Sequence, residues 1–398
     1  MFTSELPTTI QAIRELLSQH HYDLTPKVIQ QVRNAFSHFE SSDISILLDI
    51  AKASHAASLH AELSSIQPWL FTQQTLMQSS EPAFAHHVMQ SLSVKNEKVI
   101  ELCTGSGMHA FQAHNLGALD IRTHDIDPNI VSLFKLNAAN HNVKVHAECM
   151  DGLSVEISSQ DVMFADPSRR SSGLMRTSLT GTYIPDLQSI INKARNALRA
   201  AIKIAPGERI EGPFTREFLG SGKECREQIL WINTDAIDGS VTLVDKAKSF
   251  IPSNQSLLPE LVHKETLRSY SMLIEPHAAL IRGNLSCMYA EQHISVFDRS
   301  IAYGLSNEMQ DSDWFSHFRL LHVERYARKR LQDWIDANAW NAQTEIKKRG
   351  FPIEPDILRK QITFHRDSDK KGVILLTRIQ DEHMMFFCER ITSVFGGE

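Results

Sequence analysis

A chain of 398 residues is long enough for more than one domain, and 42% hydrophobic residues suffice for folded cores rather than overall disorder. Its net charge of −6 excludes a protein that binds nucleic acid through a uniformly basic composition. Five cysteines are scattered without a Cys-x-x-Cys pair, which argues against a zinc ribbon, an iron–sulfur site or a disulfide framework, so we expect no metal site.

The first 75 residues are expected to form a helical N-terminal domain. Apolar residues recur at three- and four-residue spacing in residues 10–21, 26–39 and 43–66. The chain starts without the basic and apolar blocks of a signal peptide. No apolar run approaches the roughly 18 residues that span a bilayer, so we expect a cytoplasmic protein.

From residue 98 onward, short apolar runs alternate with helical segments, which is typical of a parallel α/β sheet. We expect strands at residues 98–102, 121–127, 143–148, 161–166 and 200–207, and helices at residues 108–117, 128–142 and 186–198. Two more strands, at residues 227–235 and 240–247, lie close together in the sequence, and we expect them to form a terminal hairpin.

The C-terminal part of the chain is more basic than the rest. Residues 315–371 carry 13 Lys and Arg against 8 Asp and Glu, a net charge of +5, so the remainder of the chain carries −11. Segregated positive charge of this kind is typical of a surface that meets phosphates.

A glycine turn follows the first of these strands. Gly105 and Gly107 let the backbone turn tightly and approach a ligand where side chains would clash. Ligands of open α/β sheets lie beyond the carboxyl ends of the strands, so Asp125, at the end of the next strand, can hold ribose hydroxyls. Asp127 can serve instead. Asp151, after the third strand, is either an adenine contact or an ordinary turn residue.

This succession fits a dinucleotide dehydrogenase or an S-adenosylmethionine-dependent methyltransferase. The third glycine of the dehydrogenase pattern is Ala110 here, which that pattern tolerates. Glu101, four residues before Gly105, and the run Asp-Pro-Ser-Arg-Arg after the fourth strand favour the methyltransferase. Residues 98–245 thus resemble class I S-adenosylmethionine-dependent methyltransferases, a resemblance that implies a Rossmann-like, seven-stranded α/β domain.

The resemblance also implies a cofactor site. The acid of the first strand, Glu101 here, faces the methionine part of S-adenosyl-L-methionine in that family. Gly105 and Gly107 form the turn beside the cofactor, and Asp125 holds the ribose. Two further residues complete the expected cofactor contacts, Ile126 and Asp151.

The motif after the fourth strand lies next to the transferable methyl group in that family, so we expect Asp166, Pro167 and Arg169 to be catalytic. A carboxylate there can accept a hydrogen bond from a nucleobase amine, and Pro167 would fix the backbone around it. Arg169 and Arg170 can hold a phosphate, stack on a base, or form structural ion pairs.

Two kinds of acceptor atom remain open. Amino-methyltransferases of nucleic acid usually have an aromatic residue where this chain has Arg169. Carbon-5 pyrimidine methyltransferases tolerate that arginine but need a nucleophilic cysteine, for which Cys225 is the only candidate downstream in this region. Its surroundings, Gly-Lys-Glu-Cys-Arg-Glu-Gln, are unlike the motif of that family.

A broader resemblance covers nearly the whole chain. Residues 70–80, 165–170, 270–283, 301–306 and 346–360 resemble a bacterial methyltransferase family whose substrates are largely unassigned. The resemblance implies a helical domain at 1–75, the Rossmann-like domain at 76–275, a small ferredoxin-like domain at 276–322 and a THUMP-like domain at 323–398. THUMP domains in related enzymes bind structured RNA, often the acceptor end of tRNA.

We therefore expect an enzyme that methylates a base in structured RNA, either tRNA or rRNA. The alternatives are a methyltransferase acting on a small molecule or a protein, and a non-catalytic RNA-binding protein that retains the fold. Cationic side chains suit RNA phosphates. The expected RNA-binding residues are Arg170, Lys347, Lys348, Arg349, Arg359 and Lys360.

Overall fold

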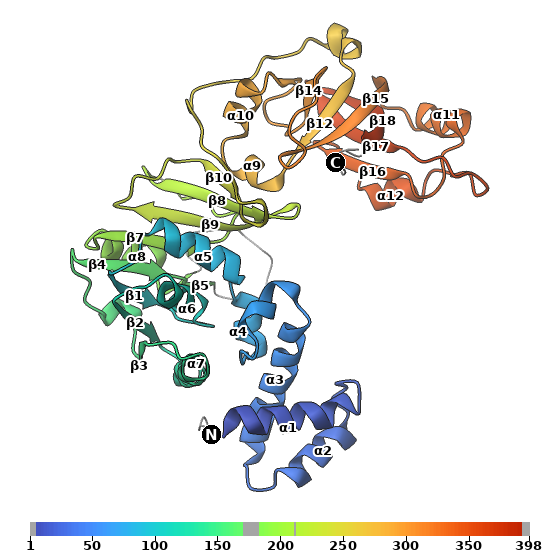
Figure 1. Ribbon diagram of the computed structural model, residues 1–398. Coiled ribbons are helices and arrows are strands. Elements are labelled where there is room, and N and C mark those ends of the chain that lie inside the picture. The colour runs from blue at the N-terminus through green and yellow to red at the C-terminus, as the bar shows by residue number, and fades with distance from the viewer. Residues whose placement is uncertain (1–4, 170–182, 211, 392–398) are drawn as a thin grey trace, which may run out of the picture. The chain divides into compact units, whose positions relative to one another are not determined.

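The computed structural model describes residues 5–169, 183–210 and 212–391. The chain divides into two compact units (Figure 1): unit 1 contains residues 1–216 and 227–236, and unit 2 contains residues 217–226 and 237–398. Arg170 lies outside the described residues, so its expected RNA contact stays a prediction.

Unit 1 begins with helices, as the apolar spacing predicted. Apolar side chains of the first three helices form a buried core that also contains Leu70 and Leu133. Since Leu133 belongs to a helix of the α/β region, the expected border at residue 75 is not marked by a break in this core. The helices are α1 (Leu6–Ser18), α2 (Pro26–Ala35), α3 (Ser41–Ser58), α4 (Gln73–Gln78) and α5 (Pro82–Ser91), with a 3-10 turn at Ala61–Ile66.

A mostly parallel sheet forms the rest of unit 1 (Figure 1). Its strand order within the unit is β9-β7-β4-β1-β2-β3, and only β9 runs antiparallel to its neighbour β7. The strands are β1 (Lys98–Leu102), β2 (Asp120–Asp125), β3 (His146–Cys149), β4 (Asp161–Ala165), β7 (Arg199–Ile204) and β9 (Glu224–Ile232). The helices between them are α6 (Met108–Asn115), α7 (Pro128–Asn140) and α8 (Leu187–Ala194).

Helices cover both faces of this sheet. Side chains alternate between the faces of a strand, so Phe164 of β4 stacks on His109 of α6 while Met163 packs with Ile190 of α8. Burial on both sides explains why residues 162–165 form a continuous apolar run. Because both faces of the sheet are buried, polar side chains lie mainly at the ends of the strands.

The terminal hairpin predicted for residues 227–235 and 240–247 is wrong. In unit 2, β10 (Ser240–Leu243) pairs in parallel with β8 (Thr215–Ser221) and antiparallel with β11 (Lys248–Phe250). We did not predict β8, because polar residues and Gly220 interrupt its apolar pattern. A parallel partner requires a crossover, so closeness in sequence misled us here.

A second, seven-stranded sheet organises unit 2, with the order β13-β14-β12-β15-β18-β17-β16. The border expected at residues 322/323 falls inside β15 (Phe315–Arg325), so the sheet continues without a break at that position. Its other strands are β12 (Met272–Pro276), β13 (Ser295–Val296), β14 (Gly304–Ser306), β16 (Glu345–Arg349), β17 (Val373–Ile379) and β18 (Glu382–Ile391). The helices are α9 (Ala278–Arg282), α10 (Leu285–Glu291), α11 (Arg328–Asn338) and α12 (Pro355–Arg359).

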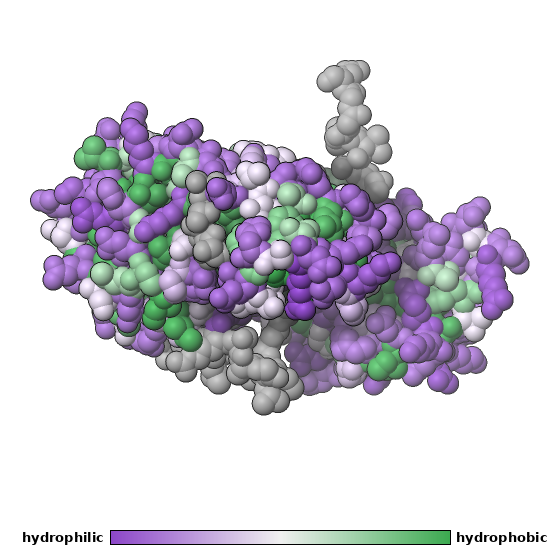
Figure 2. Space-filling model, turned by 90° about the horizontal axis from the view of Figure 1, so that it is seen from below, coloured by the Kyte–Doolittle hydropathy of each residue, from purple (hydrophilic) through white to green (hydrophobic). Residues whose placement is uncertain are grey.

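Polar side chains cover most of the face drawn in Figure 2, and apolar side chains gather there only in small groups. None of the helices within the described ranges combines the length and the apolar character needed to cross a lipid bilayer.

Candidate active site

Four acids that we singled out from the sequence gather at the carboxyl ends of four strands. Glu101 lies on β1, Asp125 ends β2, Asp151 follows β3 and Asp166 follows β4. Burial raises the pKa of the Cys103 thiol, and all four carboxyl groups raise it further. Because β4, β1, β2 and β3 are neighbouring parallel strands, the four acids lie together at one edge of the sheet.

The two glycines of the turn have different reasons to be glycine. Both have positive φ, +53° at Gly105 and +77° at Gly107. A Cβ on Gly107 would lie 2.1 Å from ring atoms of Phe134, so packing alone requires this glycine. A Cβ on Gly105 would meet nothing closer than the Cys103 carbonyl oxygen at 3.9 Å. Gly105 therefore borders open space in which a ligand can lie.

The carboxylates of Asp125 and Asp127 accept different hydrogen bonds. The Asp125 carboxylate accepts hydrogen bonds from the backbone N–H of Gly105 at 3.1 Å and of Asp127 at 3.0 Å. Burial raises its pKa, and these amides oppose that effect. The Asp127 carboxylate instead caps α7 by accepting from the Asn129 N–H at 2.8 Å. Asp127 thus has a structural task, whereas Asp125 belongs to the glycine turn.

The two remaining expected cofactor contacts also lie at this end of the sheet. Ile126 follows Asp125 directly and is 69% exposed, which is unusual for a large apolar side chain next to a sheet. Asp151 accepts a hydrogen bond from the Leu153 N–H at 2.9 Å and so caps a short 3-10 turn, Gly152–Ser154. Asp151 is therefore a turn residue that also contributes charge to the site.

Glu101 is a buried acid with an oxygen to spare. The residue is 1% exposed, and its Oε2 atom has no hydrogen-bond partner. Burial raises the pKa of Glu101 well above its ordinary value, the Asp166 charge raises it further, and a backbone hydrogen bond from Ala110 opposes both. An unpaired polar atom in this position can receive a ligand group.

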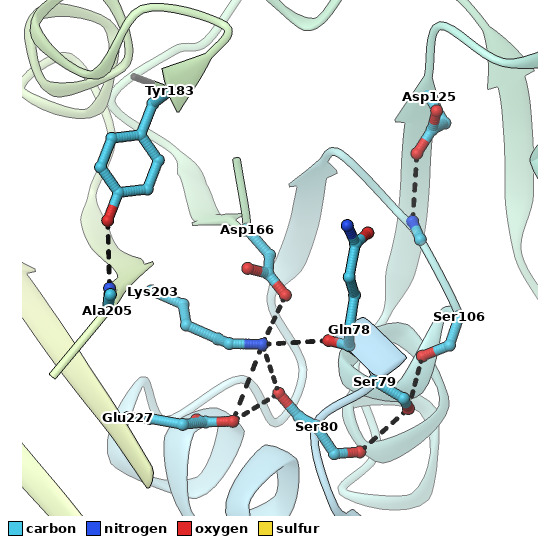
Figure 3. Close-up of polar contacts among 11 residues, drawn as sticks. Gln78, Ser79, Ser80, Ser106, Asp125, Asp166, Tyr183, Lys203, Ala205 and Glu227 are labelled. Carbon is cyan, nitrogen blue, oxygen red and sulfur yellow. Dashed lines mark hydrogen bonds and ion pairs between the residues drawn. The ribbon is translucent and has the colours of Figure 1, made fainter. Parts of the chain in front are cut away.

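The site also contains a buried cation, Lys203 on β7, which we did not predict (Figure 3). Its Nζ atom donates to Asp166 Oδ2 at 2.7 Å and to Ser80 Oγ at 3.0 Å, and lies 3.7 Å from Glu227 Oε1. Burial lowers the pKa of Lys203, but the carboxylates of Asp166 and Glu227 more than offset this, so the net direction is upward. Lys203 is thus an ammonium at neutral pH.

The segment Gln78–Ser80 connects this cation to the glycine turn (Figure 3). Ser80 Oγ donates to Glu227 Oε1 at 2.7 Å, and Gln78 O accepts from Lys203 at 3.4 Å. The neighbouring Ser79 Oγ lies 2.9 Å from Ser106 Oγ, within the turn that contains both glycines. The segment is therefore fixed to both halves of the site.

The rest of the motif at residues 166–169 is held by a short two-stranded sheet, β5 (Ser168–Arg169) with β6 (Tyr183–Ile184). Pro167 is buried directly after Asp166. Arg169 donates to the Tyr183 hydroxyl at 3.5 Å and lies 3.8 Å from a Glu208 oxygen. Tyr183 in turn accepts from the Ala205 N–H at 3.1 Å (Figure 3). Arg169 accordingly has structural partners, while its side chain stays half exposed.

The predicted RNA-binding cations of β16 do not form one patch. Side chains alternate along a strand, so Lys347 and Arg349 share one face and Lys348 points to the other. Lys347 pairs with Glu275, and Arg349 lies 3.8 Å from the same carboxylate. Lys348 pairs with Glu354. All three cations therefore have carboxylate partners within unit 2.

The other two described cations of this group lie at the end of α12. Arg359 donates to the carbonyl oxygens of Ala342 at 2.7 Å and Thr344 at 2.6 Å, so it fixes a loop. Lys360 is exposed.

Unit 2 contains a pocket of about 320 Å³ beside two of these cations. Lys347, Arg349 and Glu275 line it together with Lys223 and Trp314. Three cations line it against two carboxylates, Glu275 and Asp313, and Asp313 also pairs with Lys248 outside the lining. Within the described ranges, no group of three or more His, Cys, Asp or Glu side chains is placed to hold a metal ion.

Comparisons with known proteins agree with this geometry. Residues 84–166 match a family described as ribosomal protein L11 methyltransferase, and residues 316–390 match a family described as THUMP domain-like. The fold is similar to that of a candidate methyltransferase from Porphyromonas gingivalis W83, with a TM-score of 0.66 at 15% sequence identity, over 96% of this chain and 98% of that chain. A search of the curated proteins finds no match.

Two other solved structures are similar only in part. A candidate RNA methyltransferase from Pyrococcus horikoshii matches with a TM-score of 0.29 at 16% identity, over 39% of this chain and 73% of that chain. Magnesium protoporphyrin IX methyltransferase from Synechocystis PCC 6803 matches with a TM-score of 0.31 at 12% identity, over 43% and 88%. Likeness this partial carries no argument about substrate.

The family matches give the chain a methyltransferase-like region at residues 84–166 and a THUMP-like region at residues 316–390, and nearly the whole chain has a fold similar to that of a methyltransferase. The expected α/β fold is thereby confirmed.

Proposed function

We propose that this protein uses S-adenosylmethionine to methylate a base in structured RNA, either tRNA or rRNA. The observation that carries the proposal is the gathering of Glu101, Asp125, Asp151 and Asp166 at the strand ends beside the Gly105 turn. That arrangement counts against a non-catalytic protein that merely retains the fold.

The residues at the strand ends fit the proposed cofactor. Bound S-adenosylmethionine would supply a methyl group on a positively charged sulfur. Four carboxyl groups suit a cationic ligand, and the unpaired Glu101 oxygen is available to its methionine part. Asp125 would hold the ribose, in preference to Asp127, which caps a helix. The exposed Ile126 would cover one face of the adenine, and Asp151 would lie near its edge.

Asp166 would act on the methyl acceptor. Its carboxylate is 28% exposed at the end of β4, so it is accessible to a substrate. It would accept a hydrogen bond from the acceptor and orient its lone pair toward the methyl group. Pro167 would hold the backbone in place, and Arg169, half exposed above Tyr183, would contact the substrate base or a phosphate.

The THUMP-like region would bind the RNA. Support comes from the family match at residues 316–390 and from the net positive charge of residues 315–371. Lys347 and Arg349 would meet phosphate at the pocket in unit 2, with Lys348, Arg359 and Lys360 outside it. Lys347 and Arg349 share the single carboxylate of Glu275, so positive charge remains for a phosphate. The Glu354 side chain is 61% exposed, and exposed ion pairs are weak, so a phosphate can compete for Lys348.

Transfer of radioactive methyl groups from S-adenosylmethionine tests the proposal. The substrate is total RNA from a strain that lacks the gene, because RNA from the parent is already modified. Label should enter an RNA fraction with wild-type protein and fail to enter it with Asp166→Asn, which keeps the shape of the side chain. No incorporation into any RNA fraction would overturn the RNA substrate.

A methyltransferase that acts on a small molecule or a protein is the second candidate. The observation in its favour is that Lys347, Lys348 and Arg349 already have carboxylate partners. The same assay distinguishes it when lysate depleted of RNA serves as the acceptor.

A further inference from the structure

The two oxygens of Asp166 have different surroundings. Oδ2 accepts the hydrogen bond from Lys203 at 2.7 Å, whereas Oδ1 makes no hydrogen bond within the described part of the chain. In Figure 3 the Lys203 ammonium lies on one side of the carboxylate, and the second oxygen points away from it. One oxygen is thus fixed by the protein and the other is available.

Lys203 has no hydrogen left to give to a substrate. An ammonium has three N–H donors. Asp166 Oδ2, Ser80 Oγ and the carbonyl oxygen of Gln78 accept them at 2.7, 3.0 and 3.4 Å, with Glu227 beyond at 3.7 Å. Its side chain is 16% exposed. Lys203 therefore acts on other protein groups rather than on a ligand.

We infer that Lys203 is a positioning residue, which holds the Asp166 carboxylate turned so that Oδ1 receives a proton from an exocyclic amino group of a nucleobase. The choice of an amino group rests on the proposed function, and the role of Lys203 does not. Lys203 cannot accept the proton itself, because it is already an ammonium.

The methyl transfer balances with this assignment. The amino nitrogen forms a bond to the methyl carbon with its lone pair, and the carbon–sulfur bond breaks with its electron pair going to sulfur, which becomes a neutral thioether. The nitrogen then loses one proton to Asp166 Oδ1, from which it passes to water. A carboxylate suffices as the base, since the nitrogen becomes strongly acidic once it is methylated.

Other acceptor atoms fit the site less well. Carbon-5 of a pyrimidine requires a thiolate. The candidate thiol of Cys225 packs against an apolar core of unit 2, and burial and the four acids raise the pKa of the Cys103 thiol, which keeps it protonated. A ribose hydroxyl must lose its proton before it can attack, and a carboxylate is too weak a base for that. An amino group needs neither a thiolate nor the loss of a proton before it attacks.

The charged and titratable groups around the pair come from several elements. Lys203 faces Asp166 after β4 and Glu227 on β9. Its charge also reaches His109 on α6, where burial, and then Lys203, lower the pKa of the imidazole well below its ordinary value, so His109 is neutral. The charge of Asp166 in turn raises the pKa of Glu101 on β1.

The role of Lys203 is tested without substrate or cofactor. Carbon-13 NMR of labelled aspartate records the carboxyl signal of Asp166 at pH 7, with Asp166→Asn giving the assignment. In Lys203→Met this signal should move, because the hydrogen bond that fixes Oδ2 is gone. Lys203→Arg keeps a cation and should leave the signal near its wild-type position. An Asp166 signal that does not move in Lys203→Met would overturn the inference.

Lys203→Met can fail to fold, because it leaves Glu227 buried without its cation. The double variant Lys203→Met/Glu227→Gln removes one charge of each sign and moves the Asp166 signal in the same way if Lys203 holds Asp166. Calorimetry with S-adenosylmethionine is the second readout, and cofactor affinity should change by less than about threefold, or about 0.65 kcal/mol.

The substrate class is tested by the product. Mass spectrometry of nucleosides from RNA methylated in vitro should find the methyl group on an exocyclic nitrogen. A methyl group on a ring carbon or a ribose oxygen would overturn that half of the inference. If wild-type protein methylates no RNA, the proposed function fails, while the NMR signal of Asp166 still decides the role of Lys203.

Discussion

Lys203 and Asp166 come from neighbouring parallel strands, and their charged groups lie 2.7 Å apart where those strands end. Lys203 is a single buried cation beside the four acids at the strand ends. The acids therefore keep an excess of negative charge, which suits a cationic ligand, while one of them is held in place for chemistry.

Asp125→Ala should weaken S-adenosylmethionine binding about 10- to 100-fold, because a hydrogen bond to a charged group contributes roughly 1.5–3 kcal/mol. Asp127→Ala is the matched control. It removes the cap of α7 and should cost about 1 kcal/mol of stability while cofactor affinity stays near wild type. Isothermal titration calorimetry compares the two, and undiminished affinity in Asp125→Ala would exclude it as the ribose ligand.

Glu101→Gln should change how stability depends on pH. Burial raises the pKa of folded Glu101 above its ordinary value of 4.5. A group with a raised folded pKa contributes stability that is fully present below the unfolded pKa and is lost as pH rises through the folded pKa. The variant should therefore gain stability over wild type as pH rises from 4 to 8. Urea unfolding at several pH values measures this, and a constant difference would contradict it.

The same variant should bind the cofactor about 10- to 100-fold more weakly, because the amide cannot carry the charge that a cationic ligand induces on Glu101. Calorimetry in buffers of different ionisation enthalpy should show a proton released on binding by wild type and not by Glu101→Gln. Equal proton release from both proteins would place the linked proton elsewhere.

Gly107→Ala should destabilise the protein by roughly 2–5 kcal/mol, since it combines left-handed backbone strain with a clash against Phe134. Gly105→Ala adds only the backbone strain, about 1–2 kcal/mol, because its Cβ would point into open space. Its main effect should be on cofactor binding. Thermal unfolding and calorimetry on both variants test this division, and equal destabilisation would contradict it.

The residues of the site that could be predicted are those set by local sequence. Glu101, Asp125 and Asp166 lie at the end of a strand or directly after it, and a turn follows each strand. Their positions could therefore be predicted from the alternation of strands and helices. The role of Lys203 could not be predicted, because a single lysine inside an apolar strand looks like any other residue of that strand. Its role depends on Ser80, which lies 123 positions away, and on Glu227, which lies 24 positions away. No local sequence pattern encodes these pairings. A lone lysine in a strand buried on both faces was the available signal.

For the basic cluster of Lys347, Lys348 and Arg349, the residues could be predicted from the sequence but their contacts could not. Its charges were visible in the sequence, but their partners were not, because Glu275 reaches Lys347 from β12, far away in the chain. The alternation of β16, had we predicted a strand there, would have separated Lys348 from Lys347 and Arg349.

Replacing Lys347, Lys348 and Arg349 together by alanine should raise the dissociation constant for total tRNA and flatten its salt dependence. The slope should change by less than about 2.7, the value for three free cations on duplex nucleic acid, because carboxylates already neutralise part of their charge. Glu275→Gln frees two of the cations and should steepen the slope. Filter binding at several salt concentrations measures both, and unchanged slopes would remove this cluster from the RNA surface.

Mass spectrometry of nucleosides tests the central claim most directly. RNA is compared from the parent strain, from a strain lacking the gene, and from that strain carrying either the wild-type gene or Asp166→Asn. We predict that one methylated nucleoside of tRNA or rRNA disappears with the gene, returns with the wild-type copy and stays absent with Asp166→Asn. The same methylated nucleosides in all four strains would contradict an RNA methyltransferase that works through Asp166.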